Sequence, residues 1–174
     1  MIECEIRAFI PEEKYNELLD FFGKNAELVK QDAQETIYFD CKEDVRIQRN
    51  NFHSKIWMKK GLLHDDAREE IEIICKREDF ENLQNIFSAI GLQIHIKWLR
   101  KRLEFFWKGC TVCIDFTKGY GYIIELEKLT TEDDREKAVD ELREKLKSLN
   151  IIETSKEVFN EKYEYYKENW RMLL

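Results

Sequence analysis

Two pairs of glutamates are the side chains of this sequence best suited to chemistry: Glu3 with Glu5, and Glu125 with Glu127. Each pair lies in a run that alternates charged and apolar residues, as in the segment 2–7. In an extended strand, side chains two residues apart point to the same face and lie about 7 Å apart. Carboxylate oxygens are the ligands that hard cations such as Mg²⁺ prefer. We therefore expect both carboxylates of a pair to be able to bind one divalent cation.

Basic residues repeat this two-residue spacing in other segments. Guanidinium groups bind phosphate oxygens in pairs, whereas carboxylates reach phosphate only through a cation. Any one of these strands could be a solvated strand with surface salt bridges, but their recurrence favours a curled sheet whose charged faces converge on one lumen. A charged lumen predicts a ligand that is itself highly charged, such as a polyphosphate. The residues that share faces in this way are Arg46 with Gln48, Lys55 with Trp57 and Lys59, Arg68 with Glu70 and Glu72, and Arg100 with Arg102 and Glu104.

The elements that must position these residues follow one another with short breaks. Apolar stripes at helical spacing predict four helices: from Pro11 to Gly23, over 78–90, from a Thr131 cap to 149, and from Ser155 onward. These helices would cover the apolar faces of the strands. The predicted fold is α+β, an eight-stranded antiparallel β-barrel, closed or nearly so, with a polar charged lumen and flanking helices. The expected strands lie near 1–7, 36–41, 44–49, 55–60, 68–74, 96–107, 110–115 and 122–126.

Composition narrows the functional class. The chain has 174 residues and a net charge of −7, which argues against nonspecific binding to nucleic acid. It has neither an apolar run of about 20 residues nor the pattern of a secretory signal, so we expect a single-domain cytoplasmic protein with no membrane partner. Five irregularly spaced cysteines do not form a disulfide framework. Cys110 and Cys113 match C-x-x-C but would face opposite sides of a strand, so structural thiols are the better interpretation.

The motifs together resemble those of a known superfamily. Glu3-x-Glu5-x-Arg7 resembles the E-x-E-x-K signature of the CYTH or triphosphate tunnel metalloenzyme superfamily. That group includes class IV adenylyl cyclases, thiamine triphosphatases, inorganic triphosphatases and fungal-type RNA triphosphatases. The resemblance extends across nearly the whole chain in the same order. Its further parts are Tyr38-Phe39-Asp40, Val45-Arg46-Ile47, Ile56-Trp57-Met58-Lys59 before Gly61, Arg68-x-Glu70-x-Glu72, Arg100-x-Arg102, Asp115, Gly121 and Glu125-x-Glu127.

The resemblance implies one tunnel domain over 1–174 that binds a triphosphate-containing small molecule together with Mg²⁺ or Mn²⁺. It implies that Glu5, Arg7 and Glu127 are catalytic. Glu70 and Glu72 would orient basic groups or bind a second metal. The implied metal ligands are Glu3, Glu5, Asp115, Glu125 and Glu127. The implied phosphate-binding residues are Arg7, Arg46, Lys59, Arg68, Arg100 and Arg102.

The resemblance implies metal-dependent hydrolysis of a triphosphate, and two alternatives stay open. One is a class IV adenylyl cyclase, and the other is a non-catalytic module that binds nucleotide or polyphosphate. Two positions depart from the family pattern, because Arg7 stands where Lys is usual and Gln48 where a second Arg is common. Arg cannot act as a proton-transfer base. Near the C-terminus, aromatic residues at helical spacing predict packing against the barrel, or alternatively Tyr165 closing a tunnel mouth. The sequence does not distinguish a monomer from a homodimer, and it indicates no sequence-specific nucleic-acid binding.

Overall fold

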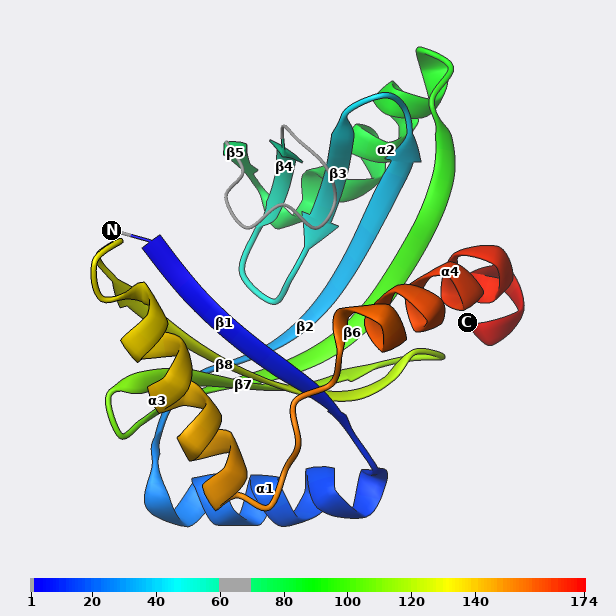
Figure 1. Ribbon diagram of the computed structural model, residues 1–174. Helices are drawn as coiled ribbons and strands as arrows, with labels where there is room; N and C mark the ends of the chain where they lie inside the picture. The colour runs from blue at the N-terminus through cyan, green and yellow to red at the C-terminus, as the bar shows by residue number, and fades with distance from the viewer. Residues whose placement is uncertain (1, 60–69) are drawn as a thin grey trace. The chain divides into compact units, whose positions relative to one another are not determined.

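The computed structural model of the protein describes residues 2–59 and 70–174. Within these ranges eight strands and four α-helices confirm the predicted α+β class (Figure 1). None of these helices combines the length and the apolar composition needed to cross a membrane. The elements are β1 (Ile2–Ile10), α1 (Glu12–Asn25), β2 (Glu27–Asp40), β3 (Asp44–Arg49), β4 (Ser54–Lys59), β5 (Glu70–Cys75), the 3-10 turn η1 (Arg77–Asp79), α2 (Phe80–Ala89), β6 (Gln93–Trp107), β7 (Cys110–Thr117), β8 (Gly121–Thr130), α3 (Arg135–Ser148) and α4 (Lys156–Leu173).

The eight strands form one antiparallel sheet in the order β1-β8-β7-β6-β2-β3-β4-β5. β1 and β5 are the two ends of this order. The chain divides into two compact units, one of Met1–Gln31 and Lys101–Glu168, the other of Asp32–Arg100 and Asn169–Leu174. The unit boundary crosses β2, β6 and α4, and each unit is described separately below.

In the first unit the apolar face of the sheet is covered by helices, as the alternation predicts. Ile6, Ile124 and Leu126 point to this face and are buried, while α3 packs along β1 and β8, and α1 contacts β7 and β8 (Figure 1). Phe22 of α1 is fully buried and stacks on Phe105 of β6 with ring centroids 5.5 Å apart. Burial of this face leaves the charged side chains of the same strands on the opposite face.

The second unit repeats this arrangement on a smaller scale. Phe80 and Leu83 of α2 pack against Ile37, Phe39 and Ile47 of β2 and β3. The even-numbered residues of β2 and β3, including Arg46, therefore lie on the face away from α2. The predicted strand parity is correct in both units.

Three boundary predictions are wrong. Gly23 does not end α1, which continues to Asn25, where the Asn25 side-chain amide donates to the Phe21 carbonyl at 2.8 Å. Thr131 does not cap α3, because its hydroxyl donates to the Asp134 carboxylate at 3.1 Å and the helix begins only at residue 135. β2 begins at residue 27 and not near 36, since polar residues occupy both faces of its first half and hide the alternation.

Candidate metal site

Acidic side chains from β1, β7 and β8 gather on the charged face of the first unit. Glu5 is the register partner of Glu127 across the β1–β8 ladder, and Cys113 of β7 is the register partner of Glu125. One ligand atom from each of Cys113, Glu125 and Glu127 can be chosen so that all three lie within 4.8 Å of one another. Glu3 lies on the same face of β1 and is exposed. The structure thus brings the two predicted glutamate pairs together.

The electrostatics of this cluster favour a bound cation. Desolvation by the surrounding groups, followed by the charge of Glu125, raises the pKa of Glu5 to about 7 and that of Glu127 to about 8, although the Glu5 side chain is still 40% exposed. Burial also raises the pKa of the Cys113 thiol, although the nearby Arg102 guanidinium opposes the shift. These groups therefore hold protons near neutral pH unless a positive ion replaces them. Because the donor atoms of Cys113, Glu125 and Glu127 lie within 4.8 Å of one another, these three residues fit a divalent cation.

Arg102 of β6 is held by two carboxylates in the same unit. Its Nε and Nη2 bind the Asp115 carboxylate in a fork at 2.8 Å and 2.6 Å, and Nη2 also contacts Glu125. Burial opposes the positive charge of Arg102, but Glu125 and Asp115 outweigh this effect and raise the pKa of the guanidinium. Asp115 is itself only 1% exposed. Arg102, predicted as a phosphate ligand, and two predicted metal ligands thus form one ion-pair network.

Arg7 lies beside the cluster and contacts α4. Its Nη1 is 3.8 Å from a Glu5 carboxylate oxygen, and its guanidinium lies over the Phe159 ring at 4.3 Å from the centroid. Sequence reasoning missed Phe159 as a partner of Arg7. The aromatic residues of α4 mostly pack, as expected: Tyr166 is fully buried in this unit, whereas Tyr165 is 61% exposed. Trp170, in the second unit, donates its indole N–H to the His95 carbonyl at 2.9 Å.

In the second unit, two of the predicted phosphate ligands are oriented by neighbours that the sequence did not single out. Arg46 binds Asp44 through two hydrogen bonds of 2.6 Å and lies over the Tyr38 ring at 4.2 Å. Arg100 donates from Nε and Nη2 to the side-chain carbonyl of Gln34 at 2.9 Å and 2.7 Å. Asp44 shares strand parity with Arg46, a signal that could have found it. Gln34 lies in the half of β2 that was not predicted.

Glu72 and Gln48 of this unit make hydrogen bonds to neighbouring side chains. Glu72 accepts a hydrogen bond from Lys55 at 2.5 Å, which fits an orienting role. Gln48, at the second departure from the family pattern, is buried and donates to the Thr36 hydroxyl at 2.9 Å. Arg68 and the side chains of Lys59 and Glu70 lie outside the described residues.

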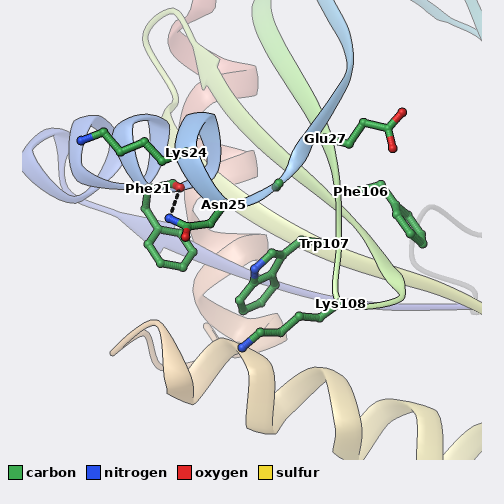
Figure 2. Close-up of a pocket in the computed structure, with 8 residues that line it drawn as sticks. Phe21, Lys24, Asn25, Glu27, Phe106, Trp107 and Lys108 are labelled. Carbon is green, nitrogen blue, oxygen red and sulfur yellow. Dashed lines mark hydrogen bonds between the residues drawn. The ribbon is translucent and has the colours of Figure 1, made fainter.

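A hollow at the C-terminal end of α1 lies elsewhere in the first unit and contains none of the predicted residues. Lys24, Trp107 and Lys108 are among the residues that line it (Figure 2). The carbonyl end of a helix disfavours an anion, and Glu27 adds negative charge to the lining. We therefore do not regard it as a phosphate site.

Known proteins resemble this chain in both sequence and fold. A family model described as the CYTH domain matches residues 1–158. A Methanocaldococcus jannaschii protein named "Putative adenylate cyclase" is 32% identical, with 87% of this chain and 91% of that protein covered. A conserved hypothetical protein from Pyrococcus furiosus has a similar structure, with a TM-score of 0.69, 23% identity and coverage of 86% and 91%. A Hippeastrum protein described as a "Putative adenylyl cyclase" with a dominant triphosphatase activity gives a TM-score of 0.64, 19% identity and coverage of 90% and 94%. At these identities the two structural similarities show the fold alone.

Proposed function

Because the chain belongs to the CYTH domain family, we propose that it is an enzyme that hydrolyses a triphosphate, inorganic or organic, with a divalent metal ion. The observation that carries this proposal is the carboxylate cluster of the first unit, in which Glu5 is the register partner of Glu127. Both carboxyl groups have raised pKa values, and the carboxylates nearest to them add further negative charge. A divalent cation would relieve this repulsion.

In this proposal Glu5 and Glu127 hold the metal, Glu125 adds an oxygen donor, and Glu3 adds another from the exposed end of the same face. When bound, Mg²⁺ or Mn²⁺ supplies Lewis-acid chemistry at a phosphoryl oxygen and activates water. Arg7 and Arg102 provide positive charge for the phosphate oxygens. Asp115 fixes the orientation of Arg102 through the two-pronged contact, so that the guanidinium does not need to be ordered when a substrate binds.

The second unit contributes further proposed phosphate ligands on grounds of sequence resemblance. These are Arg46, Lys59, Arg68 and Arg100. The contacts of Arg46 with Asp44 and of Arg100 with Gln34 support fixed orientations for two of them. Glu72 is proposed to orient Lys55, whose ammonium group donates a hydrogen bond to it at 2.5 Å.

A class IV adenylyl cyclase is the second candidate. The name of the Methanocaldococcus jannaschii relative favours it, because that protein is 32% identical to this chain over 164 residues. The description of the Hippeastrum protein favours hydrolysis instead. The two reactions share the triphosphate and the metal, and they differ in which phosphorus atom is attacked and in the products.

The products therefore distinguish the candidates. The protein is incubated with Mg²⁺ or Mn²⁺ and inorganic triphosphate, ATP or thiamine triphosphate, and the products are separated by ion-exchange chromatography. Orthophosphate supports the hydrolase, cyclic AMP with pyrophosphate supports the cyclase, and tight binding without turnover supports a binding module.

Glu127→Gln is the decisive variant for the site. We expect it to lower turnover roughly 100-fold or more, the size of effect seen when one group that stabilises transition-state charge is removed. Glu144→Gln is the matched control, because Glu144 is exposed on α3 and pairs only weakly with its neighbour Lys147. Metal-dependent turnover that survives in Glu127→Gln at the wild-type rate would show that the site is misplaced.

A further inference from the structure

A thiol lies among the carboxylates of the first unit. Cys113 is 1% exposed, and its Sγ is 4.0 Å from a Glu127 carboxylate oxygen. It shares strand parity with Asp115 on β7, so it points to the charged face of the sheet. Together with Glu125 and Glu127 it forms the group of potential ligand atoms that lie within 4.8 Å of one another.

The other buried thiols of this unit have a different environment. Cys4 and Cys110 belong to the apolar cluster beneath α1 and α3, and Cys113 does not. The thiols of Cys4 and Cys110 donate to the backbone carbonyls of Arg135 and Trp107. A cysteine that fills space in a core behaves as a small apolar residue, which explains Cys4 and Cys110. It does not explain a thiol placed between carboxylates.

The geometry suits coordination by sulfur and oxygen. Metal–sulfur and metal–oxygen bonds of about 2.3 Å and 2.1 Å span a separation of 4.0 Å at an S–metal–O angle of roughly 130°. The three ligand atoms of the group lie no more than 4.8 Å from one another. Two metal–ligand bonds in a straight line span about 4.4 Å, so the difference is only a few tenths of an ångström. Small side-chain rotations are therefore enough to close the group around one ion.

We propose that Cys113 is a ligand of the metal ion, so that the site is a mixed thiolate–carboxylate site that prefers Mn²⁺, Co²⁺ or Zn²⁺ to Mg²⁺. This inference rests on the proposed function, since it names the metal class of the same site. Mg²⁺ is a hard ion that takes oxygen ligands in octahedral geometry, whereas thiolate favours the softer ions. As the cation binds, the Cys113 S–H bond breaks, its electron pair binds the metal, and the proton is released to solvent.

Co²⁺ is the probe, because its absorption reports binding and ligand type separately. The metal-free full-length chain is titrated with Co²⁺ at pH 7.5 while the visible and near-ultraviolet spectra are recorded. Visible bands show that the ion is bound, and a near-ultraviolet sulfur-to-cobalt charge-transfer band shows that a thiolate binds it. Cys113→Ser should lose the charge-transfer band and bind Co²⁺ at least about tenfold more weakly. The matched control Cys110→Ala removes a buried thiol from the opposite face of the same strand and should retain the band.

Each outcome decides a separate question. Visible bands without a charge-transfer band in the wild type overturn the thiolate ligand and leave the proposed function intact, and so does a band that survives in Cys113→Ser. Failure of the wild type to bind any of Co²⁺, Mn²⁺ and Mg²⁺ overturns the proposed function as well. If Cys113→Ser does not fold, the spectra of the wild type and of Cys110→Ala with Co²⁺ decide. A charge-transfer band present in both supports the thiolate ligand, and visible bands without it overturn that ligand.

Discussion

Replacement of Arg102 by methionine tests the ion-pair network of the first unit. Methionine keeps an unbranched stem, although a shorter one, and the substitution removes the guanidinium that binds both Asp115 and Glu125. Two unit charges about 4 Å apart interact by roughly 4 kcal/mol at an effective dielectric constant near 20. Loss of one partner from a buried pair costs about 3–5 kcal/mol, because the other charge stays buried without compensation. We therefore expect the free energy of unfolding to fall by about 3–5 kcal/mol.

The assay is urea unfolding of the metal-free protein at pH 7.5, followed by circular dichroism. Arg143→Met is the control, because Arg143 pairs with Glu153 at 2.9 Å with both side chains more than one-third exposed. That control should lose no more than about 1 kcal/mol. The double variant Arg102→Met/Asp115→Asn should recover part of the loss, since the buried charge is also removed. A loss below about 1 kcal/mol in Arg102→Met would refute the reasoning, because such a value is typical of exposed pairs.

Three further predictions concern the protonation of Glu5 and Glu127, the role of Arg7 and the packing of Phe22. Glu5 and Glu127 have raised pKa values of about 7 and 8, so the metal-free native state binds more protons than the unfolded state above pH 4.5. The free energy of unfolding, measured by urea titration, should therefore fall between pH 5 and pH 8. Glu127→Gln should flatten this fall, and an equally steep fall in that variant would contradict the assignment. Arg7→Ala should raise KM for the triphosphate by roughly tenfold with folding intact, and an unchanged KM would remove Arg7 from the substrate site. Phe22→Ala should lower the free energy of unfolding by about 3–5 kcal/mol in urea, and a loss below 1 kcal/mol would show that Phe22 does not anchor α1.

Strand parity predicted which face each functional residue occupies. The two-residue period is a property of any extended chain. The positions of Glu3 and Glu5 on one face of β1, and of Glu125 and Glu127 on one face of β8, therefore required no tertiary information. The coverage of the apolar faces followed, because amphipathic helices must bury their stripes somewhere. The fold class was predictable for this reason.

The pairing of individual charges was not predictable, because it depends on register between strands that are distant in the sequence. Arg102 and Asp115 both carried the signal of a charged face, but only the structure shows that they bind each other. Cys113 shows the same limit. The sequence favoured a structural thiol because Cys110 and Cys113 face opposite sides of a strand, and only the structure shows that the Cys113 Sγ lies 4.0 Å from a Glu127 carboxylate oxygen. The first half of β2 was missed because Lys30, Asp32 and Gln34 lie on one of its faces and Gln31 and Glu35 on the other.

Calorimetric titration of the metal-free chain with Mn²⁺ at pH 7.5 tests the central claim most directly. The claim is that Glu5 and Glu127 together hold a divalent cation. We expect the wild type to bind Mn²⁺ with release of protons, since the cation displaces them from carboxyl groups of raised pKa. The double variant Glu5→Gln/Glu127→Gln should bind it at least about 100-fold more weakly, a loss of roughly 2.7 kcal/mol. Equal affinities for the wild type and the double variant would contradict the account.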